Sequence, residues 1–287
     1  MEKPPFEGAP ERARRRVFGV DYLHLIGKQS GDLWVTRHGW PVVESLCPSR
    51  WFVGEKFKKV GRALAGATGA VYRVPVPHPV RAAFALVVKF NRFGQEALIR
   101  AEPGIAQDWA EAAVMEAGEF LSPFEEFANL ERLKAVARIR GHLPLAIYSP
   151  PTRYREWELG RRSGPCWTIR RRLEADQAML PEDRRVVYDW ERLYILLYRW
   201  LDGIDAETAC RRGLLGEESL AALTLQTKQV LHFHGWQVLD HKPRHLILRH
   251  RNGGLLKRRG EWVWGLVDYE LLMPVASGQG SHQPEVV

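Results

Sequence analysis

The side chains best suited to chemistry lie in one short stretch, residues 238–248, which reads Val-Leu-Asp-His-Lys-Pro-Arg-His-Leu-Ile-Leu. Within it Asp240 is followed by Lys242 two residues later and by His245 five residues later, just before an apolar run of strand-forming residues. Carboxylate, ammonium and imidazole groups accept protons, neutralise anionic charge or bind metal ions. A second acid, Asp268, ends another apolar run 28 residues after the first acid. The loop and this second acid are therefore the first candidates for a functional site.

Two earlier segments have the character of anion-binding elements. The first contains Gly66-Ala-Thr-Gly69-Ala-Val71, and glycines let a backbone bend tightly over phosphates and present N–H donors to them. A plain β-hairpin turn also explains these glycines. The second segment, residues 84–90, is a run of strand formers interrupted by Lys89, and a lysine among buried strand residues needs an anionic partner. The alternative interpretation is an outward-facing lysine on an edge strand.

A predicted helix over residues 122–137 supplies acids that can pair with this lysine. Ser122 and Pro123 form a typical helix start, and apolar residues then recur at helical spacing. The acids that compete for the lysine in and before this helix are Glu96, Glu116, Glu119, Glu125, Glu126 and Glu131. A solvated acidic face also explains any of them.

The remaining elements are read from similar patterns. Residues 144–148 and 167–173 are predicted strands, and the arginines at 170–172 belong either to a solvated turn or to a contact with an anionic substrate. A further strand within residues 191–207 ends in Trp-Leu-Asp-Gly. Residues 217–234 carry a helical apolar stripe, and Gly235 ends that helix.

Together these stretches resemble the protein-kinase-like fold. The loop at Asp240 is similar to the family's catalytic loop, H-R-D-L-K-P-x-N, and the run Asp268-Tyr-Glu is similar to its metal-binding D-F-G motif. The match covers both acids, the lysine and Pro243. The sequence departs from the family at His245, which replaces the usual asparagine, and at Tyr-Glu in place of Phe-Gly.

The order of the N-terminal segments follows the same family. The glycines at 66 and 69 and Val71 match the end of the G-x-G-x-x-G-x-V loop, Lys89 takes the place of the β3 lysine, and Glu126 takes the place of the glutamate that pairs with it. The Trp-Leu-Asp-Gly strand resembles the one that leads into the interlobe hinge. The resemblance implies adenine contacts from the backbone of Arg199 and Leu201, and ribose contacts from Asp205.

The resemblance implies an α+β fold with two lobes, a β-rich N-lobe and a reduced helical C-lobe. Its expected activity is ATP-dependent transfer of the γ-phosphoryl group to a hydroxyl of an unknown small molecule, sugar, lipid or protein. Asp240 would accept or orient the hydroxyl proton, and Lys242 would neutralise charge on the moving group. Asp268 and His245 would bind Mg²⁺ or Mn²⁺, and the backbone at Gly66 and Gly69 would cover the phosphates.

His245 leaves three interpretations open, because Mg²⁺ prefers oxygen ligands. It binds Mn²⁺ or another ion that accepts nitrogen, it makes a hydrogen bond to nucleotide or loop while Asp268 carries one Mg²⁺, or the site is inactive. The alternative function is accordingly a pseudokinase module that binds nucleotide and acts in regulation or as a scaffold. Other chemistry on the same fold, such as nucleotidyl transfer, is a third possibility. Glu270 is a further candidate for a metal or structural ligand.

The expected organisation has five parts. They are a disordered basic arm over 1–16, an N-terminal extension over 17–55, an N-lobe with insertions over 56–198, a hinge and reduced C-lobe over 199–273, and a flexible tail over 274–287. Nineteen residues follow Asp268, too few for the activation segment and docking helices of a typical protein kinase. The resemblance is therefore to reduced or atypical members, namely small-molecule, lipopolysaccharide-sugar or RIO-like kinases.

Bulk composition narrows the classes of partner. The formal net charge is +8, which fits either a nucleic-acid surface or a solvated basic surface, and no nucleic-acid-binding motif supports the first. Three scattered cysteines without metal spacing, Cys47, Cys166 and Cys210, favour free thiols in a reducing, cytoplasmic setting. The sequence contains no uninterrupted run of about eighteen apolar residues, so we expect no membrane span.

Overall fold

The computed structural model describes residues 5–27, 29–64, 70–77, 84–92, 94–95, 119–151 and 166–275, and it has an α+β architecture. The predicted phosphate-covering glycines Gly66 and Gly69 lie outside the described residues, as do the acids Glu96 and Glu116 and the tail from residue 276. In the part of the chain that the structure describes, no helix combines the length and the apolar character needed to cross a membrane.

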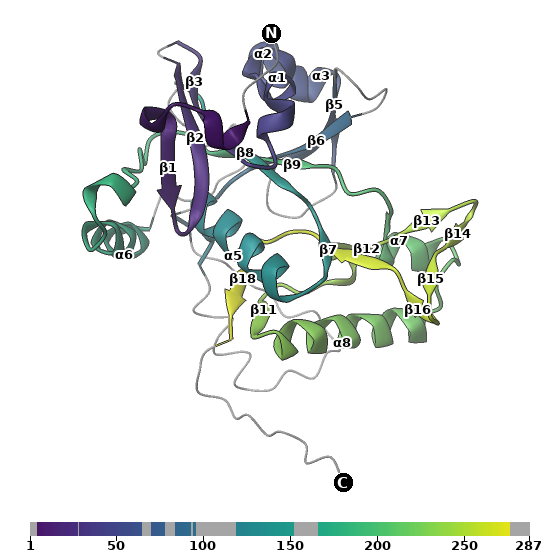
Figure 1. Cartoon of the computed structure of the whole chain (residues 1–287). Coiled ribbons are helices and arrows are strands. Elements are labelled where there is room, and N and C mark those ends of the chain that lie inside the picture. Colours follow the sequence, from purple (N-terminus) through teal and green to yellow (C-terminus); the bar gives the residue numbers. More distant parts are fainter. Residues whose placement is uncertain are drawn as a thin grey trace.

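The main element is an eight-stranded sheet in which every neighbouring pair is antiparallel (Figure 1). In spatial order its strands are β1 (Arg14–Val17), β2 (Val20–Gly27), β3 (Gly31–Thr36), β8 (Pro144–Ser149), β9 (Ile195–Arg199), β6 (Phe84–Phe90), β5 (Val71–Val76) and β4 (Arg62–Ala63). The strand that begins at Val71, the lysine strand and the strand that precedes Trp-Leu-Asp-Gly are thus neighbours in one sheet.

The strand β6 shows that this sheet is buried on both faces. Its side chains alternate, so that Leu86 and Val88 pack in one core and Val87 in another. Short helices cover the first core, and α5 (Pro123–Val136) lies against the second (Figure 1). The short helices are α1 (Val43–Leu46), α2 (Pro48–Trp51) and α3 (Lys56–Lys59). Because both faces are covered, the strand reads as a nearly continuous apolar run in the sequence.

The helix predicted over 122–137 is α5, and its start is confirmed. Ser122 is the N-cap, its Oγ accepts from the backbone N–H of Glu125 at 3.3 Å, and the Glu125 carboxylate accepts from the Ser122 N–H at 3.0 Å. This reciprocal capping box satisfies two helix-end donors. Asn129 then donates to the Leu272 carbonyl at 2.9 Å, which ties α5 to the C-terminal strands.

The second half of the chain builds smaller sheets around helix α8 (Glu217–Phe233), which is the helix predicted over 217–234. A four-stranded sheet has the order β10 (Ile204–Asp205), β12 (Leu246–Leu248), β17 (Trp264–Leu266) and β7 (Arg140–Gly141). A second pair joins β11 (Trp236–Val238) to β18 (Leu272–Pro274). The helix α7 (Ala206–Arg211) follows β10.

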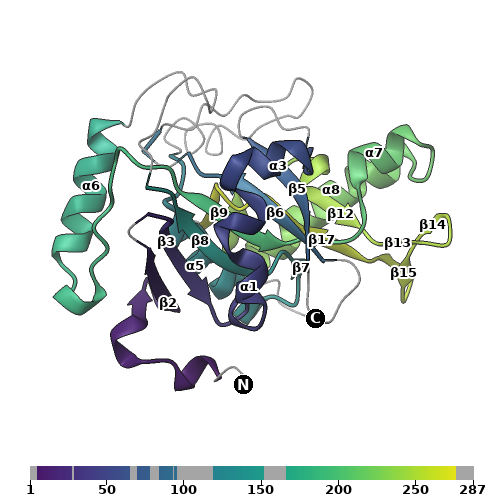
Figure 2. The same cartoon turned by 90° about the horizontal axis from the view of Figure 1, so that it is seen from above.

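Between β12 and β17 the chain makes two hairpins that project from the molecule opposite α6 (Trp167–Ala178) (Figure 2). They are β13 (His250–Arg251) with β14 (Gly254–Leu255), and β15 (Lys257–Arg258) with β16 (Glu261–Trp262). Each two-residue turn has positive φ at both positions, 52° and 80° at Asn252-Gly253 and 53° and 83° at Arg259-Gly260. Positive φ at both positions is the requirement of a type I′ turn, which matches the twist of the flanking strands.

The predicted strand over 167–173 is wrong, because these residues form the first half of α6. Ile169, Leu173 and Gln177 are buried at a spacing of four residues, which is a helical stripe. Arg170 pairs with Glu174 at 2.7 Å one turn later, which further supports the helix. The strand had been predicted because Thr168 and Ile169, near the start of the helix, are β-branched residues that favour strands.

The described residues before position 56 contribute three strands to the same sheet as the segments that follow them. Phe6 is 8% exposed in a core, and β1 pairs with β2, so the prediction of a disordered arm over 1–16 is wrong from residue 5 onward. Residues 17–55 supply β2 and β3, and β3 pairs with β8. Phe6 and Val17 are the apolar anchors in a segment whose Pro, Glu and Arg content had suggested disorder.

Candidate functional site

The centre of the candidate site is the amine of Lys89, which extends from β6 and is 7% exposed. Its Nζ lies 3.0 Å from Glu126 Oε1, 2.9 Å from Asp268 Oδ1 and 3.3 Å from Glu270 Oε2. Burial alone lowers the pKa of Lys89, but the charges of Asp268, Glu126 and Glu270 together outweigh burial and raise it. The lysine is therefore a permanently charged group with three carboxylates around it.

Glu126 is fully buried and is held by neutral donors as well as by the lysine. The Tyr198 hydroxyl donates to its Oε1 at 2.5 Å, and Asn91 Nδ2 donates to its Oε2 at 3.3 Å. Burial raises the pKa of Glu126, although the Lys89 charge opposes this. The expected ion pair between Lys89 and Glu126 is present, and its burial makes it an anchor for the lysine.

Asp268 follows β17 in the left-handed backbone region, with φ 67°. Its Oδ1 faces Lys89, and its Oδ2 lies 3.5 Å from His245 Nε2. Burial by itself would raise the pKa of Asp268, but the Lys89 charge and then His245 hold it well below its usual range. An aspartate tolerates φ > 0 better than most residues do, and here that conformation places its carboxylate between two basic groups.

The loop around Asp240 brings His245 to this cluster. The Leu239 N–H donates to the Leu271 carbonyl at 3.2 Å, and residues 243–245 form one 3₁₀ turn in which the His245 N–H donates to the Lys242 carbonyl at 2.9 Å. Lys242 Nζ lies 2.6 Å from Asp240 Oδ1. Asp240 and Lys242 are thus paired with each other, on a loop whose far end contacts Asp268 through His245.

The predicted phosphate-covering segment is described only at its end. Val71 begins β5 and lies opposite Lys89 in the β5–β6 register, so both side chains share one face of the sheet. It is half-buried and packs against the core that contains α5. The valine of the glycine-rich segment therefore lies beside the lysine, as the resemblance implies.

The backbone of Arg199 is committed within the protein, which corrects the expectation that it contacts a base. Its N–H donates to the Leu143 carbonyl at 3.0 Å, and its carbonyl accepts from His142 Nδ1 at 2.8 Å. Burial lowers the pKa of His142 to about 4, so this imidazole is neutral at pH 7. Both backbone groups of Arg199 are therefore hydrogen-bonded to residues 142 and 143.

The other two predicted nucleotide contacts differ in their surroundings. Leu201 follows β9, and its side chain lies where a side chain at Gly265 would stand, so that glycine permits a close approach. Asp205 is the N-cap of α7, and its Oδ1 accepts from the Thr208 N–H at 2.7 Å. One carboxylate oxygen of Asp205 is therefore used to cap a helix.

Three residues at the centre were not among the predicted site residues, namely Asn91, Arg92 and Tyr198. Arg92 pairs with Glu270, and Asn91 and Tyr198 donate to Glu126. One signal was available for Asn91, because it lies two residues after Lys89 and continues the same face of the strand. No local pattern indicated Arg92 or Tyr198.

The side chains around Lys89 determine whether a divalent cation can bind at this site. In the described ranges, no group of three or more His, Cys, Asp or Glu side chains is arranged to hold a metal ion by itself. Mg²⁺ is usually bound by one or two carboxylates together with substrate phosphates, and Asp268, 32% exposed at its side chain, offers such a carboxylate. His245 points its Nε2 at Asp268, so it fits a role in positioning that aspartate better than a role as an Mg²⁺ ligand.

A comparison with protein-family models finds no family that matches the sequence, and no curated protein matches it either. What this site does is therefore inferred from its own geometry.

Proposed function

We propose that the protein is an ATP-dependent phosphotransferase of the kinase-like fold, with two lobes and a nucleotide site centred on Lys89. One observation carries the proposal. Four segments that are far apart in the sequence meet at one point, because Lys89 of β6 contacts Glu126 of α5 and Asp268 after β17, and Asp268 contacts His245 of the Asp240 loop. The sequence pattern had assigned these four positions to one site.

The chain's own residues fit the parts that phosphoryl transfer needs. This reaction depends on positioning and charge neutralisation more than on covalent chemistry. Lys89 is held rigidly by Glu126 and binds phosphate oxygens of the nucleotide. Asp268 would hold a divalent cation, which when bound neutralises charge on the phosphates. His245 orients Asp268 through their contact at 3.5 Å.

Asp240 and Lys242 complete the proposed chemistry on the acceptor side. The Asp240 side chain is 28% exposed, so a substrate hydroxyl can reach its carboxylate. The carboxylate accepts the hydroxyl proton as the new oxygen–phosphorus bond forms, while the bond from the γ-phosphorus to the bridging oxygen breaks and ADP leaves. Lys242 lies 2.6 Å away, and its ammonium neutralises negative charge on the group in transfer. Their mutual ion pair keeps both side chains at the same end of the loop.

A second function, nucleotide binding without turnover, is favoured by one specific contact. Glu270 stands where the family has glycine, and its Oε2 lies 3.3 Å from the Lys89 amine. A carboxylate at this distance competes with nucleotide phosphates for the same cation. In this second reading the module senses nucleotide and regulates a partner.

The test combines turnover with binding. Transfer or hydrolysis of γ-labelled ATP is measured with Mg²⁺ and with Mn²⁺, beside nucleotide-dependent thermal stabilisation. Asp240→Asn should lower turnover about 10²- to 10⁴-fold, because it removes the proton acceptor. It also removes the charge partner of Lys242 but leaves Lys89 and Asp268 in place, so the nucleotide-dependent stabilisation should remain. Asp176→Asn, on the exposed side of α6, is the matched control and should change neither measurement.

Each outcome decides between the readings. Loss of turnover in Asp240→Asn with retained stabilisation supports the phosphotransferase. Stabilisation of the unchanged protein without any turnover supports the binding module. If nucleotide neither stabilises the protein nor is consumed, the proposal is wrong in both forms.

A further inference from the structure

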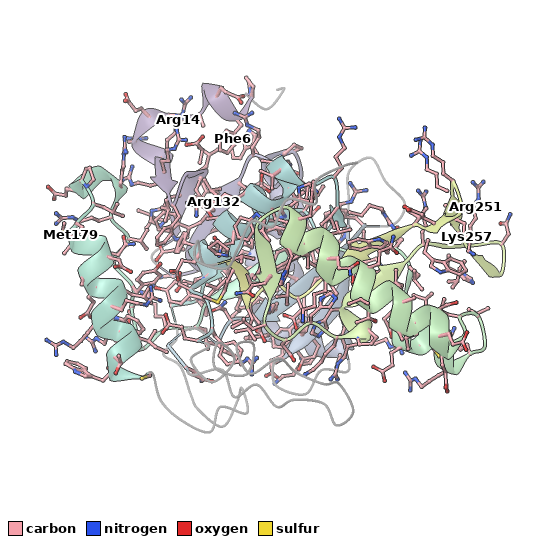
Figure 3. All side chains as sticks on the ribbon, turned by 90° about the horizontal axis from the view of Figure 1, so that it is seen from below. Phe6, Arg14, Arg132, Met179, Arg251 and Lys257 are labelled. Carbon is pink, nitrogen blue, oxygen red and sulfur yellow. The ribbon has the colours of Figure 1, made fainter. Side chains whose placement is uncertain are left out.

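A second basic site lies beside the strand that leads away from Lys89. A hollow of about 430 Å³ is formed by three segments, residues 140–143, 199–202 and 249–251. We name it the arginine pocket after Arg140, Arg199, Arg249 and Arg251, which line it together with one acid, Asp202. Arg251 lies on the projecting hairpins (Figure 3).

The positive charge in this pocket is not balanced within the described chain. Four arginines and a single acid line the hollow, and none of the four arginines makes an ion pair with a described acid. Like charges held this close repel one another unless an anion lies between them. The arrangement therefore has the charge of an anion-binding site.

Arg140 supplies independent evidence for a missing acceptor. Its Nη2 donates to the Asp202 carbonyl at 3.3 Å, but its Nη1 is buried and has no hydrogen-bond partner among the described residues. Burial lowers the pKa of Arg140, the nearby positive charge of Arg249 lowers it further, and Asp202 only partly opposes them. A buried guanidinium N–H without an acceptor is costly, and a ligand oxygen would satisfy it.

The backbone holds these arginines in place. Arg140 pairs with Gly265 in the parallel β7–β17 ladder. The Arg249 N–H donates to the Val263 carbonyl at 2.8 Å, and its carbonyl accepts from Leu256 at 2.8 Å. Three of the four arginines, Arg140, Arg199 and Arg251, are in strands, so their backbone positions are fixed before a ligand binds.

The arginine pocket is distinct from the Lys89 site. In the β6–β9 register Lys89 lies opposite Leu196, and Arg199 lies opposite Leu86. Paired residues share a face of the sheet, and faces alternate along a strand. Arg199 therefore leaves the sheet from the face opposite to Lys89.

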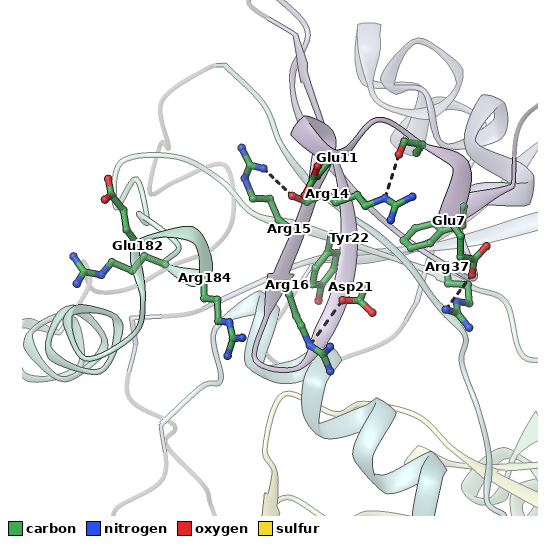
Figure 4. Close-up of a pocket in the computed structure, with 13 residues that line it drawn as sticks. Glu7, Glu11, Arg14, Arg15, Arg16, Asp21, Tyr22, Arg37, Glu182 and Arg184 are labelled. Carbon is green, nitrogen blue, oxygen red and sulfur yellow. Dashed lines mark hydrogen bonds and ion pairs between the residues drawn. The ribbon is translucent and has the colours of Figure 1, made fainter.

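A larger hollow near the N-terminus, of about 1120 Å³, is also rich in arginine but differs in its acids (Figure 4). Acids accompany its arginines. Arg37 lies 3.0 Å from Glu7, and Arg16 lies 3.8 Å from Asp21. Four acids thus stand beside the arginines of this hollow, whereas one acid lines the arginine pocket, and we assign the larger hollow no ligand.

We propose that the arginine pocket binds a small anion that carries two or more phosphates. Guanidinium groups recognise phosphate through paired N–H donors, and several of them converging on one hollow suit a compact diphosphate better than an extended strand. The volume falls within the range of small-ligand pockets. Because β7 and β12 both pair with β17, which leads to Asp268, the ligand would lie against the strands that support the Lys89 site.

The test is calorimetric titration of the full chain with pyrophosphate at constant ionic strength. The unchanged protein should bind it saturably, and Arg140→Gln and Arg249→Gln should each weaken binding at least tenfold. Arg184→Gln, from the larger hollow, and Arg171→Gln, on α6, remove the same charge elsewhere and should change the affinity less than twofold. Thermal unfolding of each variant checks that it is folded, and the exposed Arg251→Gln serves if Arg140→Gln is not.

Three results would overturn the proposal. One is the absence of saturable pyrophosphate binding by the unchanged protein. Another is an equal loss of affinity in Arg171→Gln, which would show a general effect of net charge. The third is binding only to vesicles that contain anionic lipid, or only to an oligonucleotide with a steep salt dependence, since either would mean that a surface rather than a pocket is recognised. ATP turnover plays no part in this titration, so failure here leaves the proposed phosphotransferase function untouched.

Discussion

Replacing the buried amine in Lys89→Met is the most direct test of the central cluster. The substitution keeps much of the aliphatic stem but removes the cation from three carboxylates at 2.9–3.3 Å. Breaking a buried ion pair by removing one partner costs about 3–5 kcal/mol. No discount for solvent applies to the inner pair, because the side chains of Lys89 and Glu126 are 8% and 0% exposed.

The expected cost lies near the lower end of that range, about 3 kcal/mol. Burial already raises the pKa of Glu126, so this carboxyl can take up a proton once the amine is absent. The folded variant then binds more protons than its unfolded chain, and proton uptake of this sign makes stability rise as the pH falls. The deficit of Lys89→Met relative to the unchanged protein should therefore shrink between pH 7 and pH 5.

The assay is urea unfolding followed by tryptophan fluorescence and by circular dichroism, whose agreement checks two-state behaviour. The matched control is Lys58→Met, which removes the amine of an exposed pair with Glu55 at 2.6 Å and should cost far less than Lys89→Met, because solvent screens exposed pairs. The double variant Lys89→Met/Glu126→Gln should recover about 1–2 kcal/mol relative to Lys89→Met, because it also removes the unpaired charge. Equal costs for Lys89→Met and Lys58→Met, or simple additivity in the double variant, would refute the reasoning.

Two further predictions concern stability. Burial lowers the pKa of His142 to about 4, so between about pH 6.5 and 4 the unfolded chain binds a proton that the folded chain does not. Its contribution to the free energy of unfolding should fall by about 2 kcal/mol from pH 7 to pH 5, and His142→Asn, which keeps a donor for the Arg199 carbonyl, should show a shallower pH dependence. Ser122→Ala removes the buried hydroxyl that accepts from the Glu125 N–H and from the Tyr188 hydroxyl, and it should cost about 1–2 kcal/mol in urea unfolding; an unchanged midpoint would show that the capping box does not stabilise α5.

The sequence predicted the elements that carry the cluster because each has a strong local pattern. β6 is a nearly continuous apolar run, α5 has a capped start with a helical stripe, and α8 has a stripe ended by Gly235. Pairing between strands that are far apart in the sequence leaves no comparable local pattern. The joining of β2 and β3 to β8 depends on contacts more than 100 residues apart, and the reading from composition therefore treated residues 17–55 as a separate extension.

The sequence contains a pattern typical of a hairpin turn at the first of the two projecting hairpins, although no hairpin was predicted there. Asn252-Gly253 is a strong hairpin dipeptide, since both residues tolerate positive φ. The hairpins extend the chain between the Asp240 loop and Asp268, which separates the two acids by 28 positions. The arginine pocket could not be read from the sequence, because its arginines come from three segments. The β7–β17 and β12–β17 pairings bring two of them together, and the hydrogen bonds of Arg199 to Leu143 and His142 add the third.

The assignment of Glu126 as the partner of Lys89 combines a local pattern, a physical requirement and the family resemblance. Glu126 lies four residues before Leu130 and seven before Leu133, both buried, so helical geometry places it on the stripe that faces the sheet. Glu125 is one position away and instead closes the capping box. A carboxylate on a buried stripe must meet a cation or several donors, and Lys89 is the lysine that the neighbouring apolar strand provides. Periodicity and the cost of burying charge thus favour the pairing, and the resemblance selected Glu126 among the competing acids of the sequence.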